Sequence, residues 1–219
     1  MHSRTTARVD ACQRERGQGP TTAVVSARCY LSWPEVKALL DQPALRSPSG
    51  LRNRLLLEFL YRGGLELSEA LSLRDADVQD AGPQAIRLHV EGRRGRSRLV
   101  TIRSERVASS FVPRWREVRP LGAERFFCAI VERECETGFG GPMHAGQPLH
   151  DSYVRAMVTR HAEKAGLDPR LVCPRALRHS HAVHALAEGA DLRQVQLRLG
   201  HARRDTTARY LTYIEGGPA

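Results

Sequence analysis

Lysine and long apolar segments are both scarce in this sequence. Of the 34 Lys and Arg side chains, only Lys37 and Lys164 are lysines. Aromatic residues make up 5% of the chain, and no apolar run approaches the ~18 residues that a membrane-spanning helix needs. The beginning of the sequence also lacks the apolar stretch of a secretory signal. We therefore expect no membrane association and a cytoplasmic location.

Metal-binding and disulfide motifs are absent as well. The five cysteines form no C-x-x-C pair, and their odd number and irregular spacing fit neither a disulfide framework nor a zinc site. His179, His181 and His184 are two and three residues apart, which is not the spacing of metal ligands on one helix face. We expect these histidines to be core or surface residues, the cysteines to be reduced, and no metal or cofactor to bind.

Positive charge is what the chain has in excess. The formal net charge is +10, and nearly all of the basic side chains are arginine. A guanidinium can bind a phosphate through two parallel N–H groups, so this composition indicates a polyanionic partner. An arginine-biased genome would give a similar excess, and charge alone leaves that alternative open.

The hydrophobic pattern predicts an α+β chain that is mainly helical, with one small antiparallel sheet. Alternating apolar residues over 86–90 and 100–102 flank a segment rich in arginine, which indicates a β-hairpin with a basic tip. Ser32 and Asp191 are expected to begin helices, and Glu35 to reach back to Ser32. The predicted domain limits are a flexible arm over 1–29, a folded domain over 30–213 and a short tail over 214–219.

Three side chains with phosphate chemistry gather near the C-terminal end of the sequence. Arg178 lies in Leu-Arg-His-Ser over 177–180, His201 ends a Leu-Gly-His motif, and Tyr210 follows nine residues later. A guanidinium and an imidazole can hold a backbone phosphate while a phenol attacks it.

These motifs carry a resemblance to a known family. From about Tyr30 to Tyr213, their order and spacing resemble the catalytic domain of the tyrosine recombinases, also called the phage integrase family. The segment 61–73 resembles the first conserved box of that family, and the basic hairpin resembles its β2–β3 hairpin. The resemblance implies a tyrosine-recombinase catalytic-domain fold and double-stranded DNA as the partner, together with further copies of the chain or other recombinase subunits.

The resemblance also implies a reaction. In the family, a tyrosine attacks a DNA phosphate, leaving a 3′-phosphotyrosyl bond and a free 5′-hydroxyl. Arginines and histidines neutralise the phosphate, and a hairpin lysine protonates the leaving oxygen. Carried over by position, Tyr210 matches the nucleophile, Arg178 the second-box arginine and His201 the histidine of the Leu-Gly-His motif.

Three positions depart from the family pattern. Glu66 occupies the place of the first-box arginine, Arg175 that of a histidine and Arg93 that of the hairpin lysine. Arg175 preserves a cationic donor, but Arg93 hardly releases a proton at neutral pH, and Glu66 reverses the sign of a charge. We expect Glu66 to pair with Arg175 or Arg62 and standard strand exchange to be impaired.

Six arginines are the expected DNA ligands. The four on the hairpin could instead form a solvated tip without a role in binding. The six are Arg93, Arg94, Arg96, Arg98, Arg175 and Arg178.

Two features of the chain's architecture also lead us to expect impaired strand exchange. About 29 residues precede the resemblance, too few for the core-binding domain of most members, although members similar to the fimbrial switch recombinases also lack it. Nine residues follow Tyr210, which is short for the helix that many relatives exchange between subunits.

Three functions remain open at this point. The favoured one is a nucleoid-associated DNA-binding protein with impaired or lost cleavage, acting in recombination, integration or maintenance of a mobile element. The second is an active site-specific recombinase that forms a phosphotyrosyl intermediate through Tyr210. The third is a protein-binding decoy or regulator of active recombinases.

Overall fold

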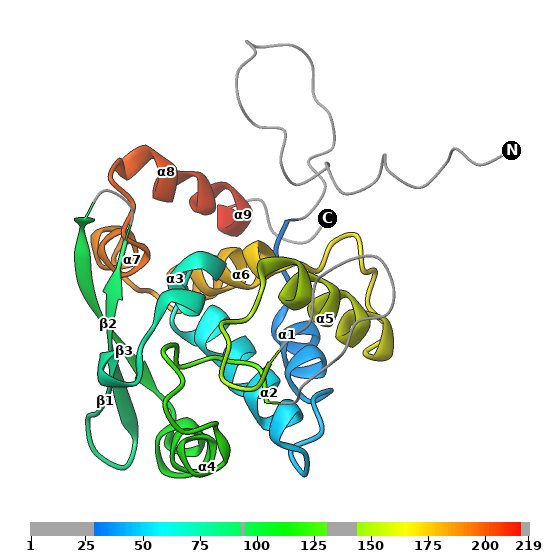
Figure 1. Ribbon diagram of the computed structural model, residues 1–219. Coiled ribbons are helices and arrows are strands. Elements are labelled where there is room, and N and C mark those ends of the chain that lie inside the picture. Colours follow the sequence, from blue (N-terminus) through cyan, green and yellow to red (C-terminus); the bar gives the residue numbers. More distant parts are fainter. Residues whose placement is uncertain (1–28, 93–94, 131–143, 216–219) are drawn as a thin grey trace, which may run out of the picture.

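The computed structural model describes residues 29–92, 95–130 and 144–215. Helices dominate it, and a small sheet lies at one side (Figure 1). The helices are α1 (Trp33–Leu40), α2 (Pro48–Arg62), α3 (Leu67–Ser72), α4 (Val112–Val118), α5 (Asp151–Lys164), α6 (Pro174–Ala187), α7 (Leu192–Leu199), α8 (Arg204–Ala208) and α9 (Thr212–Glu215). This architecture confirms the predicted fold class. Most of the predicted arm and tail lie outside the described residues.

Several helix ends follow the capping signals of the sequence. The Glu35 carboxylate accepts a hydrogen bond of 2.6 Å from the backbone N–H of Ser32, as predicted for the start of α1. Asp191 accepts one of 2.8 Å from the backbone N–H of Arg193 at the start of α7. Gly200 ends α7 with a φ of 69°, a left-handed conformation that glycine adopts without strain.

The sheet has three antiparallel strands in the order β1-β2-β3: β1 (Val78–Asp80), β2 (Ala85–Glu91) and β3 (Ser97–Arg103). Ile86 pairs with Ile102 and Leu88 with Val100, and all four side chains are buried. The predicted hairpin is therefore confirmed. The third strand, β1, was not predicted, because three residues are too few to show an alternating pattern.

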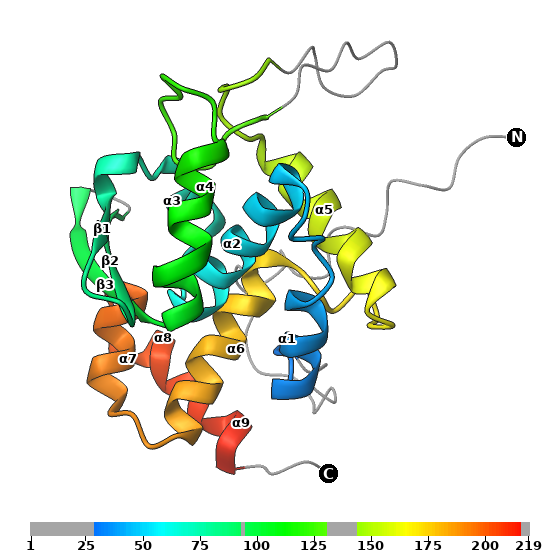
Figure 2. The ribbon, with the colours of Figure 1, turned by 90° about the horizontal axis from the view of Figure 1, so that it is seen from below.

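Helix α6 lies between two apolar clusters. Its Leu177 belongs to the main core, which includes much of α2 and the inner face of the sheet. Further along, Ala182, Val183 and Leu186 pack in a second cluster with α7 and the chain around Tyr210. Figure 2 shows α6 between α2 and the C-terminal helices. Both faces of α6 are thus held, and the side chains at its first turns are fixed in position.

Within the described residues, no helix combines the length and the apolar content needed to span a bilayer.

Candidate active site

Tyr210 lies in a short 3-10 turn, Arg209–Leu211, between α8 and α9. The residue is 5% exposed, and its hydroxyl oxygen lies 2.7 Å from Nδ1 of His179 on α6. Burial raises the pKa of the phenol to about 12, although the nearby charge of Arg178 acts to lower it. At neutral pH Tyr210, the nucleophile expected from the sequence, is therefore a protonated, hydrogen-bonded phenol.

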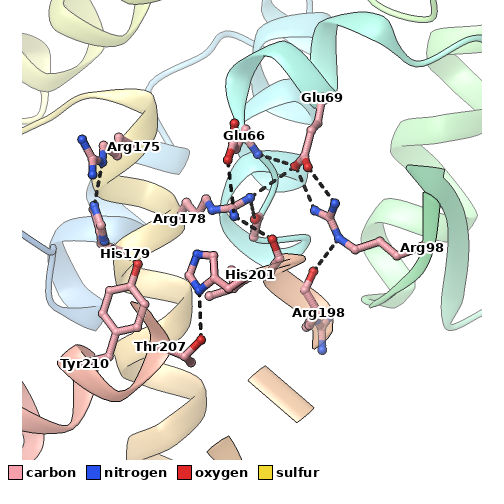
Figure 3. A network of polar contacts seen from close by, with 12 residues as sticks. Glu66, Glu69, Arg98, Arg175, Arg178, His179, Arg198, His201, Thr207 and Tyr210 are labelled. Carbon is pink, nitrogen blue, oxygen red and sulfur yellow. Dashed lines mark hydrogen bonds and ion pairs between the residues drawn. The ribbon is translucent and has the colours of Figure 1, made fainter. Parts of the chain in front are cut away.

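Arg178 is the cation at the centre of the site (Figure 3). Its Nη1 donates to the backbone oxygen of Gly64 at 3.0 Å, and its Nη2 donates to that of Leu199 at 2.6 Å. Nη1 also lies 3.2 Å from Oε2 of Glu69, and both side chains of this ion pair are 8% exposed. Arg178 thus joins the turn before α3 and the end of α7 to α6, in addition to supplying charge.

Glu66 stands at the N-terminal cap position of α3. Its Oε1 lies 3.6 Å from Nη2 of Arg178, and its side chain is 35% exposed. The sequence indicated Arg175 or Arg62 as its partner; the structure adds Arg178, and it pairs Arg62 with Glu58. The position that the sequence analysis matched to a family arginine therefore holds a carboxylate that pairs with Arg178.

Glu69 was not predicted as a site residue, yet it organises the charges around Arg178. Its carboxylate accepts two hydrogen bonds, of 2.6 and 2.8 Å, from Arg98 on β3 and one of 2.8 Å from the backbone N–H of Glu66. Burial acts to raise the pKa of Glu69, but Arg98, helped by Arg178, holds that pKa below its usual range. Glu66, Glu69, Arg98 and Arg178 form one charge cluster, and its two negative and two positive formal charges cancel.

His201 lies beside the tyrosine. The ring centroids of His201 and Tyr210 are 6.3 Å apart with an interplanar angle of 20°, and Nδ1 of His201 lies 2.9 Å from Oγ1 of Thr207. Burial first, and then the charge of Arg178, lowers the pKa of His201 to about 4. The imidazole is therefore neutral at pH 7, and it can offer a phosphate a hydrogen bond but no charge.

Arg175 approaches the site through His179. Its Nε donates to Nε2 of His179 at 3.1 Å, one helical turn along α6, and Nδ1 of the same ring meets Tyr210. Burial, followed by the charges of Arg175 and Arg178, lowers the pKa of His179 to about 4. From its spacing alone, His179 is expected to be a core or surface residue, and its contacts with Arg175 and Tyr210 go beyond that expectation. Its i, i+4 spacing from Arg175 was the signal available.

The structure separates the hairpin arginines that the sequence groups together. Arg93 and Arg94 lie outside the described residues. Arg96 is exposed, whereas the Arg98 side chain is 12% exposed and is held by Glu69 and by a backbone carbonyl of α7. Arg96 stays a candidate phosphate ligand, while Arg98 belongs to the charge cluster.

The functional groups of the site are hydrogen-bond donors and a phenol. Within the described residues, no three His, Cys, Asp or Glu side chains gather in a group that could hold a metal ion. The site offers a buried guanidinium, two neutral imidazoles and a phenol, a set suited to holding an anionic oxygen near a nucleophile.

Comparisons with known sequences show the family of the chain. Residues 30–214 match the model of the Phage integrase family. Tyrosine recombinase XerD of Xanthomonas axonopodis pv. citri (strain 306) is 38% identical over 208 residues, which cover 91% of this chain and 66% of that protein. Tyrosine recombinase XerC of Pelotomaculum thermopropionicum is 34% identical over 187 residues, covering 85% of this chain and 58% of that protein. The chain thus spans less than two thirds of the length of these relatives.

Solved structures show the same fold. The XerH site-specific recombinase bound to palindromic difH substrate, in a post-cleavage complex, aligns with a TM-score of 0.68 at 25% identity over 84% of this chain and 49% of that one. XerA recombinase aligns with a TM-score of 0.66 at 23% identity over 92% of this chain and 68% of that one, a likeness of fold. By sequence and by fold, the chain belongs to the phage integrase family, the tyrosine recombinases.

Proposed function

We propose that this protein binds double-stranded DNA and acts in DNA recombination, integration or maintenance of a mobile element, with strand cleavage impaired or lost. Family membership, the net charge of +10 and the DNA-bound state of the XerH relative support the DNA-binding part. The impairment rests on one observation: the guanidinium of Arg178 is shared by the carboxylates of Glu66 and Glu69, at 3.6 and 3.2 Å.

The neutral charge cluster leaves little positive potential for a phosphate. A carboxylate about 5 Å from a phosphate charge costs about 3 kcal/mol at an effective dielectric constant of about 20. The partial exposure of Glu66 lowers that cost, because solvent screens the charge. Loss of the family arginine comes in addition, and one such donor is worth about two to three decades of rate. Ground-state binding over a wide surface is less sensitive to this position than cleavage is.

Proton transfer is impaired at both ends of the reaction. The leaving 5′-oxygen needs a proton, and Arg93, in the place of the family lysine, is a poor donor at neutral pH. The attacking phenol must lose a proton, and burial has raised its pKa to about 12. Both effects slow cleavage without weakening DNA binding.

A working recombinase is the second candidate, and the positions of three side chains favour it. Tyr210, Arg178 and His201 come together in the structure, and the Tyr210 hydroxyl is already oriented by His179 at 2.7 Å. Residual cleavage through this set would leave a phosphotyrosyl bond to DNA.

Covalent trapping distinguishes the two candidates. The full chain is incubated with nicked duplexes of randomised sequence, and detergent-resistant protein–DNA adducts are counted, with Tyr210→Phe as the control. The proposal predicts a salt-dependent shift of duplex DNA with no adduct, or only a trace, above the level for Tyr210→Phe. Abundant adduct that Tyr210→Phe abolishes would establish the active recombinase instead. Absence of binding even at low salt would also overturn the proposal and favour the decoy.

A further inference from the structure

His179 contacts both the guanidinium of Arg175 and the phenol of Tyr210. Its Nε2 accepts the Nε–H of Arg175 at 3.1 Å, and its Nδ1 lies 2.7 Å from the Tyr210 hydroxyl oxygen. Figure 3 shows the three side chains in line along one side of the site. The family resemblance assigns no role to this histidine.

The direction of the first hydrogen bond determines the second. A guanidinium can only donate, so Nε2 of His179 must carry a lone pair. A neutral imidazole has one N–H, and with Nε2 unprotonated the proton resides on Nδ1. Burial and the charges of Arg175 and Arg178 lower the His179 pKa to about 4, so the doubly protonated ring is excluded near neutral pH. The Nδ1–H then points at the Tyr210 oxygen.

We infer that Arg175 fixes the tautomer of His179 so that the Nδ1–H of this ring donates to the Tyr210 oxygen. His179 contacts the reacting oxygen directly, and Arg175 is a positioning residue that acts through it. A donor to the phenol oxygen stabilises the phenolate over the phenol, and it leaves the phenol's own proton free for another acceptor. An arginine at the place of a family histidine thereby orients the nucleophile instead of only adding charge.

Other groups around the phenol also shift the pKa of Tyr210, some upward and some downward. Burial raises the Tyr210 pKa, Arg178 and Arg175 lower it, and Cys29 raises it. The neutral ring of His201 is stacked on that of Tyr210, with the centroids 6.3 Å apart. The hydrogen bond from His179 is the contact that a single substitution can remove while leaving these charges in place.

The tautomer can be measured directly on the full chain without DNA. Long-range ¹H–¹⁵N correlation NMR on uniformly labelled protein reports which imidazole nitrogen carries the proton, and the His179 signals are assigned by their loss in His179→Asn. The inference predicts a protonated Nδ1 in the unsubstituted protein and a shift of the proton to Nε2 in Arg175→Leu. A proton on Nε2 in the unsubstituted protein would overturn it.

Ionisation of the phenol provides a second measurement. With ¹³Cζ-labelled tyrosine and Tyr210→Phe for assignment, His179→Leu should raise the Tyr210 pKa by about one unit, a tenfold change in its ionisation constant. His179→Asn can place an amide N–H near the original Nδ1 and should restore most of that shift. An unchanged pKa in folded His179→Leu would contradict the inference. The inference rests on and deepens the proposed function. Because neither measurement depends on cleavage, the inference can fail while the proposed function holds, and the reverse is also possible.

Discussion

Arg178 combines two tasks in one side chain. It donates to two backbone carbonyls that lie on different segments, and it neutralises the buried Glu69. These contacts give Arg178 a structural role in addition to any role at a phosphate.

Removal of this side chain should therefore unfold the protein more easily. We expect Arg178→Ala to lower the free energy of unfolding by about 3 kcal/mol, because Glu69 would stay buried without one of its partners. Arg155→Ala, which breaks a half-exposed i, i+4 pair on α5, should cost less than about 1 kcal/mol. Urea denaturation followed by circular dichroism compares them. Equal costs for the two substitutions would show that the buried contacts of Arg178 contribute little.

At the scale of elements, the turn between α2 and α3 is fixed by its contact with α6 and α7. Gly64 has a φ of +61°, and a Cβ atom there would lie 2.7 Å from Cδ2 of His181 and 2.8 Å from Cδ2 of Leu199. The carbonyl of the same glycine accepts from Arg178. Close approach of this turn brings Glu66 and Glu69 to the site.

Gly64→Ala should separate these elements. It combines backbone strain of about 1–2 kcal/mol with overpacking of about 1–3 kcal/mol. Gly166→Ala is the matched control, since its φ is +70° but no atom lies within 4 Å of the added Cβ, so only the strain applies. Thermal or urea unfolding should show a distinctly larger loss for Gly64→Ala. A loss no larger than for Gly166→Ala would mean that the turn can move away from α6 at little cost.

Helix α6 also makes stability depend on pH. The pKa values of His179 and His181 are lowered to about 4 and about 3, and that of His201 nearby to about 4, in each case chiefly by burial. Because the unfolded chain binds these protons near pH 6.5 and the folded chain does not, stability is full above about pH 6.5 and falls as pH decreases toward 4.

Each of these histidines can contribute up to about 1.4 kcal/mol per pH unit in that window. Urea midpoints measured from pH 7.5 to 4.5 should decline, and His181→Gln should reduce the slope. His150→Gln, at an exposed position, should leave it unchanged. A stability that is flat across the window would contradict the buried, neutral state of the three rings.

The sequence predicted local features of the fold better than contacts between distant residues. Capping at Ser32 and Asp191 and the apolar alternation of the hairpin were predicted correctly, because they depend on neighbours along the chain. The roles of Glu69 and Arg98 were missed, since the pair joins residues 29 positions apart. The sequence places Arg98 with the other hairpin arginines, and its hydrogen bonds to Glu69 of α3 and to a backbone carbonyl of α7 show that it is held inside.

For the whole molecule, the distribution of arginines predicts which of them contribute to DNA binding. Arg96 is exposed on the hairpin, while Arg98 is bound to Glu69. The logarithm of the DNA-binding constant falls linearly with the logarithm of the salt concentration, and Arg96→Ala should make this slope less steep by about 0.9, the value for one lost phosphate contact. The unfolding midpoint should stay unchanged. Arg98→Ala should instead lower the midpoint, because Glu69 loses a partner that donates two hydrogen bonds. Equal effects of both on the salt slope would contradict this assignment.

In the function proposed above, the charge at residue 66 controls strand cleavage. The neutral cluster around Arg178 predicts that Glu66→Arg, which restores the family charge, increases phosphate stabilisation. On ordinary DNA, Arg93 in the place of the family lysine would donate a proton poorly to the leaving oxygen, and slow departure of that oxygen would mask the gain in phosphate stabilisation. A duplex pool with a bridging 5′-phosphorothiolate removes that obstacle, because a thiol of pKa about 8.5 leaves as the thiolate without a proton donor.

Detergent-resistant adduct should be measured on this pool for the unsubstituted protein, Glu66→Arg and Glu117→Arg, the last being an equal change of charge on an exposed residue of α4. We predict that Glu66→Arg raises the rate of adduct formation about tenfold or more, that Tyr210→Phe in the same background abolishes it, and that Glu117→Arg leaves it unchanged. Substantial adduct from the unsubstituted protein that Glu66→Arg destroys would show that the carboxylate supports cleavage, and would contradict the proposed impairment.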